Sequence, residues 1–196
     1  MNDLDRGPAP VKEEFDPVKW TRIFWLAIIG LLAAVILGLL AWFFIVFSFI
    51  DLKDKGVSMF FPRGWRVETQ APGIVVAFVS PKETALDSFS ENVVLSTYDM
   101  SNNPLNTDKY VDLMIKQMEG VFSNIKLVDR KFFLAAGRNG YQLEFHVADD
   151  VPKVILVYAF TVEATGYNLV YMGVKDRYSK DKLLMDIMAL FMKVKD

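Results

Sequence analysis

The segment Ile23–Ile50 has the sequence IFWLAIIGLLAAVILGLLAWFFIVFSFI and contains no charged side chain. A helix over this segment would be roughly 42 Å long, more than the roughly 30 Å hydrocarbon core of a bilayer. The pattern predicts one transmembrane helix over residues 21–50, and its excess length indicates tilt or continuation against protein beyond the lipid. We therefore expect a head over residues 1–20, the helix, and an extramembrane domain over residues 51–196.

A cleaved secretory signal is the alternative interpretation of the apolar segment. Signal peptides have an apolar region of about 7 to 15 residues, a basic region before it and a small-residue cleavage site after it. This segment is longer, the head before it is rich in acidic residues, and no A-x-A pattern follows Ile50. The sequence predicts a signal anchor that is retained.

The flanks of the segment do not orient it, because Lys and Arg are balanced on its two sides. Long C-terminal domains translocate largely regardless of their charge, so we expect a cytoplasmic N-terminus and a periplasmic domain on a bacterial inner membrane. The absence of cysteine is compatible with an envelope location and excludes no compartment. The head, with Pro8, Pro10 and Pro17, is expected to be disordered or held by a partner.

Small residues recur along one face of the predicted helix. Gly30, Ala34 and Gly38 are four residues apart, and Ala27 and Ala41 extend the row. Such a row lets a second backbone approach closely and predicts a contact with another transmembrane helix. The alternative is the general abundance of Gly and Ala in membrane helices. Tryptophans near both ends of the helix are predicted to mark the membrane interfaces: Trp20, Trp25 and Trp42.

The domain over residues 51–196 is close to neutral, since it carries 18 of the 22 Lys and Arg and 19 of the 24 Asp and Glu of the chain. This balance argues against a nucleic-acid partner, which requires a concentrated basic face. The apolar periodicities of the domain indicate short strands separated by turn residues. They are predicted at residues 57–61, 67–70, 74–80, 92–98, 125–134, 141–147, 154–162 and 167–174, with turns at Gly137–Gly140 and Glu163–Gly166.

Two amphipathic helices are expected among these strands. The first is capped by Thr107 and has a buried face of Val111, Met114, Ile115, Met118 and Phe122. The second is capped by Ser179, and its buried face holds Leu184, Ile187, Met188 and Phe191, with Leu183 and Val194 beside it. Antiparallel strands with two helices predict an α+β sandwich in which the helices cover the faces of one antiparallel sheet.

The segment Gly56–Trp65, GVSMFFPRGW, resembles the opening signature of the PsbP-like families. The order of elements after it also matches those families, so the resemblance covers residues 56–196. It implies an α/β/α sandwich of the kind found in extrinsic subunits of photosystem II, related accessory factors and the bacterial envelope protein DcrB. Those proteins are mostly not enzymes, and they bind, stabilise or help to assemble membrane complexes. This chain departs from them by carrying an uncleaved helix.

No catalytic residue, cofactor or metal site is predicted. The chain has no cysteine and one histidine, His146, and it lacks nucleophile-elbow, Walker and dinucleotide-binding glycine patterns. A metal site of His146, Glu144 and Asp149 is the alternative to a solvated strand face. The charged groups Asp149–Asp150 and Lys175–Arg177 are interpreted as solvated, with docking surfaces as the alternative.

Two hypotheses for function follow. The first is a single-span accessory or structural subunit that docks on, stabilises or helps to assemble an integral membrane protein complex. The second is a membrane-tethered module that holds a small apolar ligand or lipid, although a ligand carrier has no need of a small-residue helix face. Its pocket would be lined by six aromatic side chains: Phe60, Phe61, Trp65, Phe145, Tyr158 and Tyr171.

Overall fold

The computed structural model describes residues 17–68, 73–82 and 89–195. It divides into two units, Met1–Ile45 and Val46–Asp196, and each is described by itself. The second unit is called the domain below. Most of the predicted head, residues 1–16, lies outside the described residues.

The described part of the first unit is formed by the helix α1 (Pro17–Val46), whose last residue already belongs to the second unit. It begins at Pro17 rather than at residue 21, and proline suits the first turn of a helix, where its missing N–H costs nothing. Its segment Phe24–Val46 is long and apolar enough to cross a membrane. These 23 residues rise about 35 Å, so the excess over the bilayer core is smaller than the sequence predicted.

The prediction that the helix extends to Ile50 is wrong. Residues Phe47–Leu52 form strand β1, which pairs antiparallel with β2 (Val57–Pro62) from Phe47↔Pro62 to Leu52↔Val57. A charge-free apolar run suits a helix and a strand equally, and here pairing with β2 decides between them. The domain therefore begins at Val46 rather than at residue 51.

A small three-stranded sheet joins distant parts of the domain, in the order β1-β2-β10. The 3₁₀ turn η1 (Lys53–Lys55) and Gly56, in the left-handed region at φ 64°, connect β1 to β2. The last strand, β10 (Lys193–Val194), pairs with β2 on its other side. Only β2 of these three strands was predicted.

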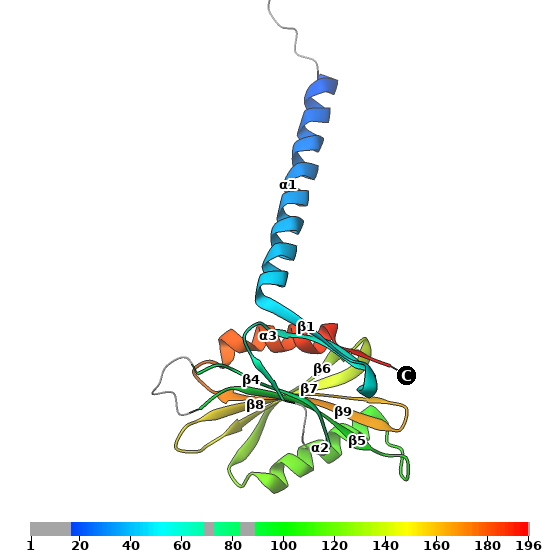
Figure 1. Cartoon of the computed structure of the whole chain (residues 1–196), viewed down its shortest axis with the longest axis vertical. Helices are drawn as coiled ribbons and strands as arrows, with labels where there is room; N and C mark the ends of the chain where they lie inside the picture. The colour runs from blue at the N-terminus through cyan, green and yellow to red at the C-terminus, as the bar shows by residue number, and fades with distance from the viewer. Residues whose placement is uncertain (1–16, 69–72, 83–88, 196) are drawn as a thin grey trace, which may run out of the picture. The chain divides into compact units, whose positions relative to one another are not determined.

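The main sheet is antiparallel and has seven strands in the order β3-β4-β5-β9-β8-β7-β6. Figure 1 labels β4 to β9 of this sheet. All seven were predicted, within a few residues at their ends. The interior strand β8 is buried at every residue from Val154 to Phe160. The strands are β3 (Arg66–Glu68), β4 (Ile74–Val79), β5 (Asn92–Asp99), β6 (Ile125–Ala135), β7 (Arg138–Val147), β8 (Lys153–Val162) and β9 (Thr165–Val174).

Two hairpin turns are tighter than predicted. Ala136 and Gly137 alone connect β6 to β7, with φ values of 51° and 70°, and Arg138–Gly140 belong to β7. Two positive φ values in a two-residue loop match the right-handed twist of the paired strands. Glu163, at φ 50°, and Ala164 connect β8 to β9, so Thr165 and Gly166 are already in the strand.

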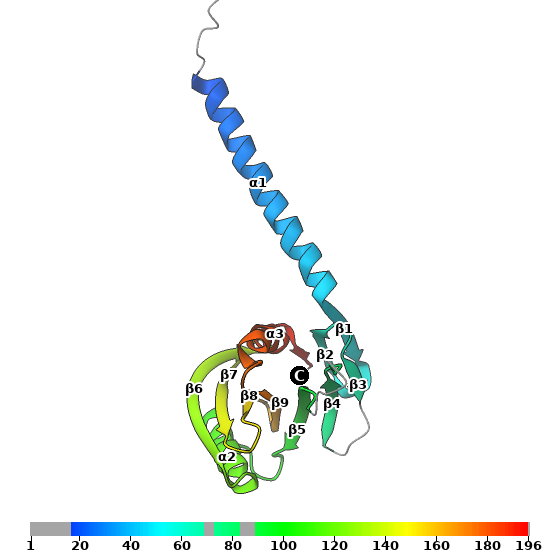
Figure 2. The ribbon, with the colours of Figure 1, turned by 90° about the vertical axis from the view of Figure 1, so that its left-hand side faces the viewer.

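The helices α2 (Thr107–Val121) and α3 (Tyr178–Phe191) cover opposite faces of the main sheet (Figure 2). On the α2 side, buried Tyr110, Val111 and Met114 pack on the sheet, as predicted for the last two. The α2 cap differs from the prediction: the Asn106 side chain accepts a hydrogen bond from the Lys109 N–H at 3.0 Å. The Thr107 hydroxyl instead lies 2.8 Å from that of Thr161.

The buried face of α3 differs from the predicted one. It consists of Met185, Met188 and Ala189, and only Met188 was on the predicted face. The side chain of Phe191 is 49% exposed and that of Leu183 is 58% exposed. The cap is also different, since the helix follows Arg177 without a side-chain cap and Ser179 lies inside it.

Candidate functional site

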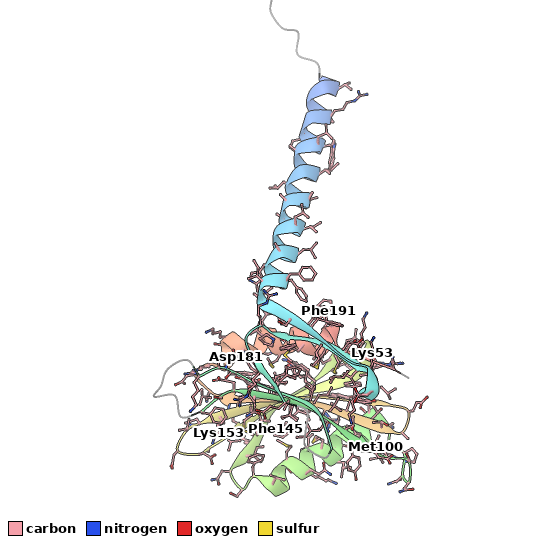
Figure 3. The ribbon with its side chains drawn as sticks, in the orientation of Figure 1. Lys53, Met100, Phe145, Lys153, Asp181 and Phe191 are labelled. Carbon is pink, nitrogen blue, oxygen red and sulfur yellow. The ribbon has the colours of Figure 1, made fainter. Side chains whose placement is uncertain are left out.

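A layer of polar side chains lies between α3 and the sheet, and we call it the tyrosine–carboxylate layer. Its members from α3 include Asp181, which Figure 3 labels on the α3 side of the domain. The members of the layer come from β7, β8, β9 and α3. The fold therefore brings together residues that are far apart in the sequence. The layer consists of Gln142, Glu144, Tyr158, Tyr171, Tyr178, Asp181, Lys182 and Asp186.

Asp186 is the centre of the layer. Its Oδ1 accepts hydrogen bonds from the Tyr158 hydroxyl and from the Gln142 side-chain amide, each at 2.6 Å. Its Oδ2 accepts a hydrogen bond from Lys182 Nζ at 2.9 Å. Both carboxylate oxygens are therefore satisfied, which the interior of a protein requires of a partly buried charge.

The other two tyrosines each donate to a carboxylate. The Tyr171 hydroxyl donates to Asp181 Oδ2 at 2.9 Å, and the Tyr178 hydroxyl donates to Glu144 Oε2 at 2.5 Å. Glu144 Oε1 lies 3.0 Å from His146 Nε2. Three tyrosines thus connect α3 to the sheet by hydrogen bonds to three separate carboxylates. These bonds explain why Asp181 and Asp186 lie on the side of α3 that faces the sheet.

An ion pair lies beside this layer. Glu91 is 4% exposed, and its Oε1 accepts a hydrogen bond from Arg177 Nη1 at 3.1 Å. Its Oε2 accepts one from the Ser80 hydroxyl at 2.8 Å. A pocket of about 180 Å³ opens next to the pair, between Trp65 and Leu184 among other residues.

The three tyrosines are neutral donors at neutral pH. Burial raises the pKa of Tyr158, Tyr171 and Tyr178 far above the usual value, and the neighbouring carboxylates raise each pKa further. A phenolate is therefore strongly disfavoured at all three positions. The tyrosines of the layer therefore act as hydrogen-bond donors that connect α3 to the sheet.

The raised pKa values predict a loss of stability in alkali. Below pH about 10 these tyrosines are neutral in both the folded and the unfolded chain, so their hydrogen bonds stabilise the fold fully. Above it the unfolded chain loses these protons first, so the free energy of unfolding falls, by at most about 1.4 kcal/mol per pH unit for each of the buried Tyr158 and Tyr171. The contribution of Tyr178 is smaller, because its side chain is partly exposed to water. Urea unfolding of the detergent-solubilised chain at pH 8 to 11 measures this decline.

The Tyr158→Phe variant is expected to show a shallower alkaline decline than the wild-type chain, because one buried phenol is gone. Tyr98→Phe is the matched control, since Tyr98 is 46% exposed. An equal decline in wild type and Tyr158→Phe would contradict the assignment of this loss to the layer.

The alternative metal site does not assemble. His146 is close to Glu144, but Asp149 instead forms an ion pair with Lys153 at 2.8 Å. Across residues 17–68, 73–82 and 89–195, no group of three or more His, Asp or Glu side chains is placed to hold a metal ion. Of the charged groups considered for docking, Arg177 is engaged with Glu91, and Asp150 lies on the exposed surface.

The predicted helix face is continuous in the structure. Its five small residues, Ala27, Gly30, Ala34, Gly38 and Ala41, all lie within α1 and are exposed. A Cβ added to Gly30 or Gly38 would meet no atom within 4 Å. Trp25 is 57% exposed and Trp42 is 44% exposed, whereas the Trp20 side chain lies outside the described part of the structure.

The six aromatic residues of the ligand-pocket hypothesis are dispersed. Phe145 belongs to the core on the α2 side, whereas Tyr158 and Tyr171 bond to α3. Phe61 stacks on Phe78 with ring centroids 4.8 Å apart. An open pocket of about 690 Å³ occurs elsewhere, and its lining includes the charged side chains of Asp149, Asp150 and Lys153.

The helix face was predicted from the spacing of its small residues and stays a prediction, whereas the tyrosine–carboxylate layer was not predicted. It treated Tyr158 and Tyr171 as apolar aromatics. One local signal was available, because Lys182 and Asp186 are four residues apart on one helix face, where a salt bridge forms. The tyrosine partners of Asp186 and Asp181 carry no such local signal.

Comparison with known proteins finds no matching family model and no matching curated protein. Several solved structures do match the domain. The solution structure of cyanobacterial PsbP (CyanoP) from Synechocystis sp. PCC 6803 is 17% identical at a TM-score of 0.55, covering 76% of this chain and 93% of that one.

Two further structures match at similar levels. LpqN of Mycobacterium tuberculosis is 10% identical with a TM-score of 0.58, covering 76% of this chain and 91% of that one. The Ran-binding protein Mog1p of Saccharomyces cerevisiae is 8% identical with a TM-score of 0.57, covering 76% of this chain and 96% of that one. At these identities the likeness shows the fold alone, and the domain has the PsbP-like α+β sandwich fold that the sequence resemblance predicted.

Proposed function

We propose that this chain is a single-span membrane protein that acts as an accessory or structural subunit. In this proposal α1 anchors it in a bacterial inner membrane, with the N-terminus in the cytoplasm and the domain in the periplasm. The small-residue face of α1 contacts an integral membrane protein complex, and the domain docks on the same complex and stabilises it or assists its assembly.

The observation that carries the proposal is the exposure of α1. Its most apolar stretch lies within Phe24–Val46, and none of it is buried among the residues that the structure describes. Apolar surface of this size is not left in water, so lipid or another protein must cover it. The small residues along one side of the helix favour a helical partner on that side.

The domain supports a binding role rather than a catalytic one. Its internal carboxylates are occupied by tyrosine, glutamine, lysine and arginine donors, and these contacts join α3 to the sheet. Among the fold neighbours, LpqN is described as involved in cell envelope biogenesis, and Mog1p is described as a Ran-binding protein. Such a fold can thus serve recognition, which is the role proposed here.

The double variant Gly30→Ile, Gly38→Ile is expected to lose at least tenfold in co-purification with its partner complex. Two β-branched side chains would hold the partner backbone away from α1. Folding should be unaffected, because both positions face open space in the chain. Native gels and mass spectrometry of mild-detergent extracts measure the co-purification.

The control is Leu32→Ile, Leu40→Ile, which places the same β-branched residue away from the small-residue face of α1 without adding bulk there. It should co-purify like the wild-type chain. Equal co-purification of the glycine double variant would contradict the helix face as the contact. A chain that migrates alone in every extract would contradict the accessory-subunit role itself.

A further inference from the structure

Three aromatic rings form a patch on the surface of the domain. Phe49 of β1 is 57% exposed, Phe191 at the end of α3 is 49% exposed, and half-buried Phe60 of β2 lies between them. The Phe49 and Phe60 ring centroids are 5.1 Å apart, and those of Phe60 and Phe191 are 6.5 Å apart. We call these residues the phenylalanine patch. Figure 3 shows its member Phe191 at the surface on the α3 side.

The patch points away from the core. Along β2, the neighbours of Phe60 are Met59, which is fully buried, and Phe61, which is 8% exposed and stacks on Phe78. Successive strand residues face opposite sides, so Phe60 and its partner Phe49 face outward together. Phe49 and Phe60 therefore belong to the outward face of the small sheet rather than to the buried core.

The surroundings of the patch combine apolar and basic groups. Leu190, next to Phe191, is 44% exposed. Lys193 pairs with Ser58, which shares the outward face of β2 with Phe60, so the lysine lies on the same face. Asp51 opposes Ser58 from the other side, so the row is not uniformly basic. Apolar rings with a nearby lysine suit the boundary between acyl chains and phosphate head groups.

The chain keeps the patch close to the end of α1. Strand β1 begins at Phe47, directly after the last helical residue, Val46. Phe49 is three residues further, which is about 10 Å of fully extended chain. This bound holds for every orientation of the domain, and the ring contacts bring Phe60 and Phe191 with it.

We propose that the phenylalanine patch inserts into the interfacial zone of the lipid bilayer and fixes the orientation of the domain on the membrane. This inference rests on the proposed function, because the end of α1 lies at the bilayer surface only if α1 spans the membrane. The patch would then act as a second, shallow attachment beside the helix. It would limit which surfaces of the sandwich are available to a partner complex.

The test uses the absence of cysteine from the chain, which allows a single label at any position. The full-length variant Phe191→Cys is labelled with an environment-sensitive fluorophore and reconstituted into phosphatidylcholine–phosphatidylglycerol vesicles, with and without nitroxide-bearing lipids. We expect a blue-shifted emission and at least twofold more quenching by the nitroxide lipids than for the control Val121→Cys. Val121 is 74% exposed and lies at the end of α2.

A label that responds like the Val121→Cys label would overturn the inference. Shielding that rises with protein concentration and is insensitive to nitroxide lipids would also overturn it, in favour of contact with a second copy. Phe49→Cys provides a second position if Phe191→Cys does not fold. Leu32→Cys, within α1, tests the anchor separately: without quenching there, the proposed membrane span itself fails.

Discussion

Replacing Phe145 with alanine is expected to lower the free energy of unfolding of the domain by about 3–5 kcal/mol. Phe145 is fully buried on the α2 side, in the same cluster as Tyr110, Val111 and Met114. The truncation removes apolar contacts and leaves a cavity in a core that α2 and the sheet close from both sides. Urea unfolding of the full-length chain in detergent, followed by near-ultraviolet circular dichroism, measures the loss.

The matched control is Val121→Ala, an apolar truncation at a position that is 74% exposed. It should change the free energy of unfolding by no more than about 0.5 kcal/mol. Since domains of this size are stable by roughly 5–15 kcal/mol, the Phe145→Ala variant should also be degraded faster in cells. A loss below about 1 kcal/mol for Phe145→Ala would contradict the α2-side core described here.

Replacing Arg177 with methionine is expected to destabilise the domain by about 3 kcal/mol, because it leaves the Glu91 carboxylate buried without its cation. Glu91 keeps only the Ser80 hydroxyl among its side-chain donors named above. The expected value lies at the lower end of the range for buried pairs, since the Arg177 side chain is 29% exposed and water reaches it. Urea unfolding again measures the change.

The double variant Glu91→Gln, Arg177→Met separates the two causes of this loss. Glutamine carries no charge, so the double variant should recover at least 1 kcal/mol relative to Arg177→Met alone. If the two changes are instead additive, the loss comes from the packing of the arginine stem rather than from the uncompensated carboxylate.

The fold was largely predictable, because most strands of the main sheet have a recognisable local pattern of apolar and polar residues. Strand β7 alternates between apolar and polar side chains, and β8 is an apolar run, and both patterns survive in the structure. The predicted ends of helices and strands were wrong where the local sequence suits more than one structure. Phe47–Leu52 is a strand only because β2 offers a pairing edge, and no feature of FSFIDL by itself distinguishes it from the end of a membrane helix.

The orientation of α3 was not predictable for a different reason. Apolar residues occur around much of this helix, so two faces compete on hydrophobicity alone. The tyrosines of the sheet decide between them by binding Asp181 and Asp186, and this choice leaves Phe191 at the surface. The cap of α2 was also not predictable from the sequence alone. Asn106 and Thr107 are adjacent, and residues of both types can cap a helix.

Of the candidate surfaces, the helix face could be predicted from the sequence, whereas the phenylalanine patch and the tyrosine–carboxylate layer could not. The helix face required only a spacing of four residues, from Gly30 to Ala34 to Gly38. The phenylalanine patch and the tyrosine–carboxylate layer require contacts between strands and α3 that are far apart in the chain. Sequence periodicity reports on one element at a time, so it cannot find them.

The position of β2 between β1 and β10 has a consequence for biosynthesis. One edge of β2 finds its partner as soon as residues 47–62 have emerged, but the other edge waits for Lys193 and Val194. The pairing of β5 with β9 is similarly delayed, since Asn92 must wait for Met172. Non-local pairings of this kind form slowly. The two sheets of the domain are therefore completed only after nearly all of residues 47–194 have been synthesised.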